Sequence, residues 1–137
     1  MSVGFLMVRS ERRPYGLPLD RVVEVADITE VLTVPRNEVS IRGLTPLRGR
    51  LVTLVHLGAF LGRRAPPAER GRAAVLVRLG GAGRFVAFEV DDADEVVREA
   101  PLPLPDGASL PWAAGVAPRG DGLIPILDLE LLGDRFA

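Results

Sequence analysis

The chain has 137 residues with 17 basic and 18 acidic side chains, so no global field directs it toward nucleic acid or anionic lipid. It contains no cysteine, which excludes disulfides, thiolate catalysis and cysteine-based zinc sites. At 137 residues with 47% hydrophobic residues the chain suits one ordinary domain, and no signal peptide or membrane-length apolar run is visible, so we expect a soluble, intracellular protein.

Glycine and proline interrupt the chain at short intervals and leave Val-rich apolar stretches of about four to eight residues, too short for typical helices. Many short strands separated by turns indicate an all-β sandwich or barrel. Helix is limited to single turns, expected at Leu57–Leu61 and Leu129–Leu132. In chain order, the predicted strands span Val3–Val8, Tyr15–Leu19, Val22–Val25, Glu30–Val34, Ile41–Leu47, Leu51–Leu57, Ala74–Leu79, Phe85–Val90, Glu95–Arg98, Trp112–Ala117 and Leu123–Leu129.

Three polar or glycine-rich segments connect these strands. Leu79–Phe85 contains a tight glycine turn and predicts a hairpin. Arg63–Arg72 is polar and proline-containing, so we expect it to separate the two halves of the chain. Ala100–Pro111 has alternating prolines that favour an extended conformation, as in a surface connector or a ligand of SH3-type domains.

The two halves of the chain resemble each other. Ile41–Leu57 matches Ala113–Leu129 at a constant offset of 72 positions, with glycine, proline and leucine in register. Upstream, Glu24 matches Glu95 at an offset of 71. A fixed internal period indicates one supersecondary unit used twice.

No catalytic or metal-binding set of residues emerges from the motifs. His56 is the only histidine, and without cysteine it cannot complete a zinc site or activate a thiol. It occupies the position of Asp128 in the second repeat. We interpret it as a partly buried polar residue at the end of a strand. A hydrolase that uses a Ser–His pair at His56 remains an open alternative. Asp91–Glu95 lacks the spacing of a calcium loop and is interpreted as a solvated turn between strands. We therefore expect no metal and no cofactor.

Glu24 and Arg48 are the charged residues that most need an explanation. Glu24 is a lone acid within the apolar stretch Val22–Val25, and Arg48 lies at a turn between two apolar strands. An acid in an apolar setting needs a partner, and an arginine side chain offers two parallel donors. The two residues are either an ion pair or two unrelated surface charges.

Segments in both halves of the chain resemble the signature of CheW-like chemotaxis coupling proteins. Members of that family typically carry V-x-E-I, then V-P, then I-x-G-V-x-N-L-R-G followed by V-x-P-V-x-D-L. The resemblance covers essentially the whole chain. It is carried by Val22–Val25, Val34–Pro35, Ile41–Leu44, Leu47–Gly49 and Leu51–Leu57, and in the second half by Val86–Asp91, Asp94–Val97, Ala114–Val116 and Leu123–Leu132.

The resemblance implies an all-β fold of two packed SH3-like five-stranded barrels within one CheW-like domain, residues 1–137. It divides the chain into a first subdomain at about 15–72 and a second made of about 1–12 plus 73–137. Members of the family are not enzymes. The implied partners are the cytoplasmic tip of methyl-accepting chemoreceptors, a CheA-type histidine kinase and other CheW-like proteins in cytoplasmic arrays, with no nucleic acid and no insertion into the membrane.

The resemblance also implies a receptor-binding site in an apolar groove between the two barrels. Within that site, Glu24 and Arg48 are expected to form a structural ion pair. By position, the residues that line or support the groove are Val22, Glu24, Val25, Gly43, Leu47, Arg48 and Val97.

The chain departs from the family pattern at three places. Thr45-Pro46 stands where the family pattern has x-N, so proline replaces the usual asparagine. His56 replaces the usual aspartate at the end of the following strand. The stretch between Val97 and Gly115 is shorter than usual and rich in proline, so part of the second barrel is expected to be trimmed. A full coupling protein and a reduced accessory protein, which binds receptors without recruiting the kinase, therefore both remain open.

Overall fold

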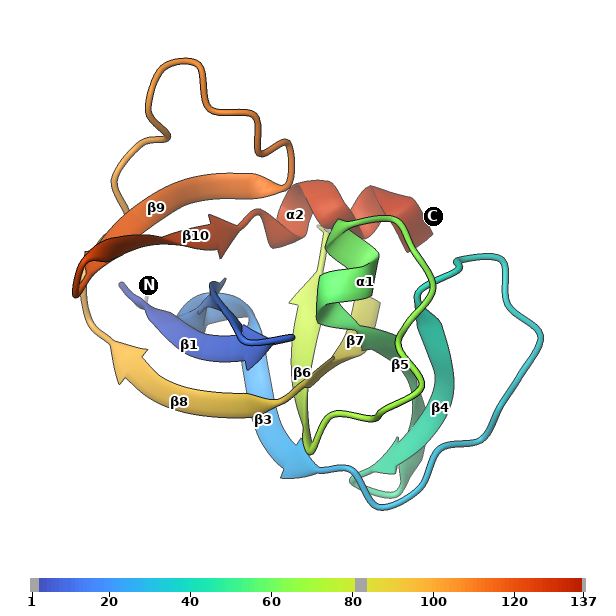
Figure 1. Cartoon of the computed structure of the whole chain (residues 1–137). Coiled ribbons are helices and arrows are strands. Elements are labelled where there is room, and N and C mark those ends of the chain that lie inside the picture. Colours follow the sequence, from blue (N-terminus) through green and yellow to red (C-terminus); the bar gives the residue numbers. More distant parts are fainter. Residues whose placement is uncertain (1–2, 81–83, 137) are drawn as a thin grey trace.

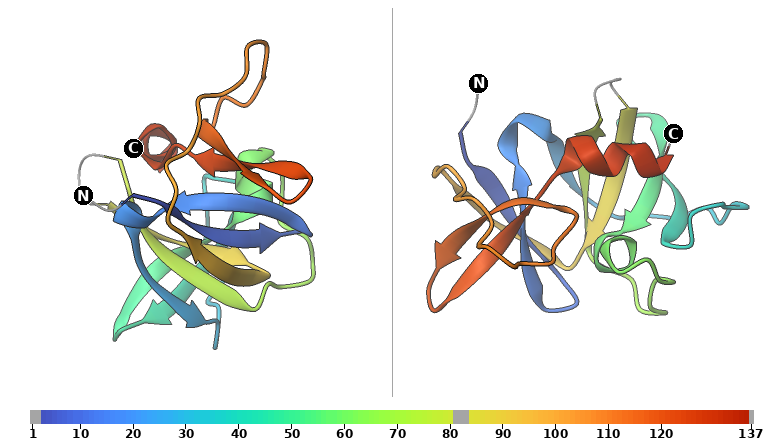
Figure 2. Two further views of the ribbon diagram at one scale, coloured as in Figure 1. Left: turned by 90° about the vertical axis from the view of Figure 1, so that its left-hand side faces the viewer. Right: turned by 90° about the horizontal axis from the view of Figure 1, so that it is seen from above.

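The computed structural model describes residues 3–80 and 84–136, whose strands form two five-stranded sheets lying side by side (Figures 1 and 2). Barrel one has the strand order β3-β6-β7-β5-β4, and barrel two has the order β8-β1-β2-β10-β9. The predicted architecture of two packed five-stranded barrels is confirmed. The strands of barrel one are β3 (Val22–Asp27), β4 (Ile41–Leu47), β5 (Arg50–His56), β6 (Ala73–Leu79) and β7 (Arg84–Val90), and those of barrel two are β1 (Phe5–Ser10), β2 (Arg13–Pro18), β8 (Asp92–Val97), β9 (Ala113–Arg119) and β10 (Gly122–Leu127).

Both barrels are built on one plan, which accounts for the internal repeat. An edge strand (β3 or β8) is followed by a hairpin (β4–β5 or β9–β10) and then by a helical turn, α1 (Leu57–Leu61) or α2 (Leu129–Leu132), at the predicted positions. A second hairpin completes each sheet by parallel pairing, β7 with β5 and β2 with β10. In barrel two this hairpin, β1–β2, comes first in the chain, so one unit is a rearranged copy of the other.

The division of the chain differs from the expected one of 15–72 and 1–12 plus 73–137. Barrel one spans residues 22–90, and barrel two combines residues 5–18 with 92–127. The 63–72 loop joins α1 to β6 within barrel one, because β6 and β7 pair with β3 and β5. The β2 strand stays with barrel two because a tight turn pairs it with β1.

Three local predictions need correction or restriction. Residues 30–34 do not form a strand and make only one bridge, from Leu32 to Leu44. Asp92–Glu95 lies within β8, since pairing with β1 outweighs the turn preference of its aspartates. The glycine hairpin β6–β7 is present, with Leu79 opposite Arg84, but residues 81–83 of its turn lie outside the described residues.

The largest hydrophobic core lies between the barrels. Each barrel has a small core of its own, around Leu54 and Leu76 in barrel one and around Phe5 and Ile126 in barrel two. The space between the barrels is thus filled by the chain's own side chains, whereas we expected an open apolar seam. This inter-barrel core includes Leu6, Val8 and Leu17 of barrel two and Val75, Val77 and Phe88 of barrel one.

A buried ion pair fastens the 63–72 loop to barrel one. The Glu89 side chain is fully buried, and its carboxylate accepts hydrogen bonds from Arg42 Nε at 3.0 Å and from the Gly71 backbone N–H at 2.7 Å. Arg42 also donates to the carbonyls of Pro67 and Glu69. The pair therefore satisfies loop carbonyls as well as compensating a buried charge.

We predict that Arg42→Ala lowers the free energy of unfolding by about 3–5 kcal/mol, because Glu89 is left as a buried charge without its counterion. The double variant Arg42→Met with Glu89→Leu removes both charges and should recover part of that loss, since the Pro67 and Glu69 carbonyls and the Gly71 N–H still lose their side-chain partners. Urea denaturation of the two variants measures the difference. A single variant that unfolds within about 1 kcal/mol of the wild type contradicts the buried-pair account.

Candidate interaction surface

A tight hairpin turn places Arg48 beside the edge strand β3. Leu47 pairs with Arg50, so Arg48 and Gly49 alone form the turn, with φ of 52° and 75° as in type I′ hairpins. Arg48 Nε lies 2.7 Å from Glu24 Oε1, although no N–H is aligned for a hydrogen bond. The Arg48 side chain is 68% exposed, so the pair joins the hairpin to the strand and contributes little to stability.

Barrel two contains a second ion pair in the equivalent position. Arg119, at the end of β9, binds Glu95 of the edge strand β8. Both partners follow Arg48 and Glu24 at an offset of 71. Sequence reasoning matched the two glutamates but missed Arg119, because the strands of the hairpins align at an offset of 72, which sets Arg48 against Gly120.

The two hairpin tips differ in chemistry. At barrel one a pocket of about 250 Å³ is lined by apolar side chains including Leu47 and Phe85, with Arg48 at its rim. The equivalent pocket of barrel two adds an acid to its lining: Arg9, Glu95 and Arg119 lie there beside the apolar Met7, Leu123 and Ile124. We define the tip surface of barrel one as the exposed side chains Val23, Val25, Arg48 and Phe85 together with the half-buried Glu24.

The predicted groove residues do not form one continuous groove. Val22 packs on the inter-barrel core, and Val97 is buried in the core of barrel two. Gly43 has a φ of 151°, and a Cβ there would lie 2.2 Å from the Leu32 carbonyl oxygen. Glycine is therefore needed at this position because the backbone of residue 32 passes close to β4. Those that gather at the tip of barrel one are Glu24, Val25, Leu47 and Arg48.

His56 caps helix α1. Its Nδ1 accepts a hydrogen bond from the Ala59 N–H at 3.0 Å, as the Asp128 carboxylate does from the Leu131 N–H in the second repeat. The side chain is 3% exposed, and the hydroxyl of nearby Ser10 accepts from the Gly58 N–H. These contacts give the histidine a structural place in the fold.

Burial lowers the pKa of His56 and outweighs the neighbouring carboxylates of Glu89 and Glu11, which act in the opposite direction. The capping bond also requires an unprotonated Nδ1. The folded protein therefore keeps a neutral imidazole at a pH where the unfolded chain already binds a proton.

We predict that the stability of the protein falls as the pH drops below about 6.5, because from there the unfolded state takes up the His56 proton and the folded state does not. His56→Asn keeps a capping oxygen without a titrating group, so its free energy of unfolding should vary less with pH between about 7.5 and 5.5. Urea denaturation at both pH values tests this. Equal pH dependence in the two proteins would argue against a neutral, capping His56.

Within residues 3–80 and 84–136, no three histidine or carboxylate side chains gather as a metal site requires. No helix in the described part of the chain is long and apolar enough to cross a membrane.

Comparison with known proteins decides the family. The sequence model of the CheW-like domain matches residues 4–136. The chain belongs to the CheW-like domain family. Among solved structures, it is similar to the scaffolding protein TtCheW from Thermoanaerobacter tengcongensis, with 22% identity, a TM-score of 0.79, and coverage of 96% of this chain and 88% of that one. No curated protein matches the chain significantly.

These matches confirm the family resemblance and the fold of the CheW-like protein. The match to TtCheW shows that the fold is shared, with both barrels and nearly the full length of each chain aligned. The family match likewise includes both hairpins and both edge strands. The roles of individual residues at the tip of barrel one are a separate question.

Proposed function

We propose that this CheW-like protein is a non-enzymatic chemosensory adaptor in cytoplasmic arrays. It binds the cytoplasmic tip of methyl-accepting chemoreceptors and couples them to a CheA-type histidine kinase. The observation that carries this proposal is the family match over residues 4–136, which includes both barrels. TtCheW, which shares the fold, is a scaffolding protein, and this is consistent with the proposal.

The receptor contact is assigned to the tip surface of barrel one. Val25 and Phe85 are 47% and 40% exposed on a sheet that the inter-barrel core holds in place, so the apolar face of a partner helix can pack there. Arg48 adds exposed donors beside them for carboxylates on the same helix. In this assignment Leu47 supports the surface from beneath, whereas Val22 and Val97 belong to the hydrophobic cores and Gly43 to the close approach of β4 and Leu32.

The kinase contact is assigned to barrel two. The short, proline-rich connection suggested that this barrel is trimmed, yet it has five strands, and residues 98–112 form a loop that projects from β9 (Figure 1). Leu102 pairs with Val116 at the root of that loop, as Leu32 pairs with Leu44 in barrel one. A complete barrel favours the full coupling protein over the reduced accessory one.

The alternative of a hydrolase that uses His56 has little support in the geometry. A general base must offer its free ring nitrogen to the nucleophile. His56 Nδ1 is occupied by the Ala59 N–H, and Ser10 accepts from Gly58. A loss of measurable turnover in His56→Ala, with folding retained, would revive this alternative.

We predict that Arg48→Glu weakens binding to a receptor signalling domain about tenfold or more in calorimetry, because it places a like charge beside Glu24 and removes the exposed donors. Arg119→Glu makes the same change at the equivalent turn of barrel two and should leave receptor affinity unchanged. Both arginines are partly or largely exposed, so the free energy of unfolding of each variant should stay within about 1 kcal/mol of the wild type.

The two variants test the location of the receptor contact, and the wild-type protein tests the adaptor function itself. Equal losses in Arg48→Glu and Arg119→Glu would contradict the assignment to barrel one. Failure of the wild-type protein to bind any receptor signalling domain at high micromolar concentration would contradict the adaptor function itself. A stable complex of wild-type protein, receptor and kinase would exclude the reduced accessory form, whereas receptor binding without the kinase would establish it.

A further inference from the structure

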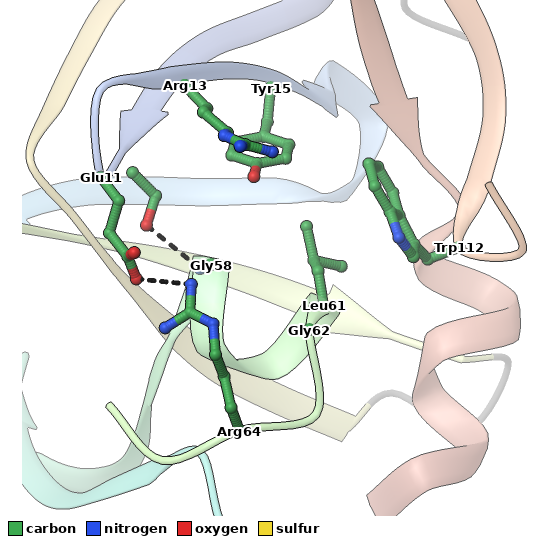
Figure 3. Close-up of a pocket in the computed structure, with 9 residues that line it drawn as sticks. Glu11, Arg13, Tyr15, Gly58, Leu61, Gly62, Arg64 and Trp112 are labelled. Atoms are coloured by element: carbon green, nitrogen blue, oxygen red, sulfur yellow. Dashed lines mark hydrogen bonds and ion pairs between the residues drawn. The ribbon is translucent and has the colours of Figure 1, made fainter. Parts of the chain in front are cut away.

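A second pocket lies where helix α1 of barrel one meets barrel two, and no step of the proposed function uses it. Its volume is about 480 Å³. Figure 3 shows side chains of the β1–β2 hairpin above it, α1 and the residue pair Gly62 and Arg64 below, and Trp112 at one side. We call it the α1 pocket; it is lined by Ser10, Glu11, Arg13, Tyr15, Gly58, Leu61, Gly62, Arg64 and Trp112.

The α1 pocket offers donors that have no acceptor. Arg64 is paired with Glu11 at 2.7 Å, but the side chain of Arg13 has no hydrogen-bond or ion-pair partner among the described residues. Tyr15 is 8% exposed, its hydroxyl points toward α1, and no described group bonds to that hydroxyl (Figure 3). Burial raises the pKa of the Tyr15 phenol, so it stays a donor. Leu61 and Trp112 give the pocket apolar walls, so it fits a carboxylate carried beside an apolar group.

Helix α2 presents that chemistry on the same molecule. At an offset of 72, Gly58 of α1 corresponds to Glu130 of α2, and Gly62, just after α1, corresponds to Asp134, just after α2. The glycines leave the α1 pocket open, whereas the equivalent positions at α2 carry exposed carboxylates around Leu131, which is 50% exposed. The internal repeat has thus given one helical turn a hollow lined by two arginines and one glutamate. It has given the other an acidic projection with an apolar centre, whose exposed Glu130 also lies 3.6 Å from Arg21.

The α1 pocket and α2 lie next to each other on one face. Trp112 lines the pocket, and its carbonyl accepts a hydrogen bond from the Asp128 N–H at 2.8 Å, just before α2. The view from above in Figure 2 shows α1 and α2 both uncovered. A face that carries a pocket and its complement side by side can pair with a copy of itself about a two-fold axis.

We propose that a second copy of this chain docks its helix α2 into the α1 pocket, and that the exchange is mutual. Glu130 and Asp134 of each copy face Arg13 and Tyr15 of the other, and Leu131 packs between Leu61 and Trp112. The contact is a symmetric homodimer held by opposite charge around an apolar centre. It uses neither hairpin tip, so it stands independently of the proposed receptor contact.

Sedimentation velocity of the full chain over a range of concentrations tests this proposal, with Glu130→Arg and Arg13→Glu as variants. The wild type should dimerise, and added salt should weaken the dimer. Each variant alone sets like charges together at both contacts and should raise the dimer dissociation constant about tenfold or more. An equimolar mixture of the two variants restores opposite charges at both contacts and should regain wild-type dimerisation.

Asp121→Arg and Arg98→Glu are the matched controls, because they reverse exposed charges away from α1 and α2. Both should dimerise like the wild type, and melting curves verify that every variant is folded. A wild type that stays monomeric at all concentrations overturns the proposal. So does a mixture that fails to recover, or a control that weakens the dimer as much as Glu130→Arg does.

Discussion

The hydrophobic core between the barrels is the constraint on which the other features depend. It is larger than the core inside either barrel and takes buried side chains from both sheets. Each buried leucine or valine stabilises the folded state by roughly 1.5–3 kcal/mol relative to an exposed one. Separating the barrels would expose these side chains to water and would therefore cost a large free energy. Two small sheets, each with a modest core, are therefore stable as one unit.

This shared core fixes the geometry of the surfaces outside it. The hairpin tips lie at the outer ends of the sheets. Because the shared core holds the two sheets against each other, the position of one tip relative to the other is fixed. The α1 pocket depends on the core more directly, since Tyr15 and Trp112 come from barrel two and Leu61 from barrel one. An adaptor that positions two partners relative to each other needs this kind of rigidity.

The sequence predicted what is local or repeated. Short Val-rich stretches and their turns gave most strands, and both helical turns were expected at the ends of the repeated segments. The apolar setting of Glu24, together with the family resemblance, brought Glu24 and Arg48 into one hypothesis. The wrong division into subdomains has a different cause, because parallel pairing of β2 with β10 joins segments that are far apart in the chain. Periodicity within a segment carries no information about which distant hairpin completes its sheet.

The charged residues show the same limit. The Arg42–Glu89 pair was missed because Glu89 alternates with apolar neighbours as a solvent-facing residue would, yet the 63–72 loop covers that face. Asp92–Glu95 was misassigned because its turn preference is local and its pairing with β1 is not. In both cases long-range packing decided the outcome, and a single sequence does not display it.

Native-state hydrogen exchange tests the shared core most directly. Amides of β6 and β7 in barrel one and of β1 and β2 in barrel two should be protected by the same opening free energy, equal to that of global unfolding. Barrels joined only by their linkers would instead open separately. Two distinct opening free energies, one for each sheet, would contradict the account.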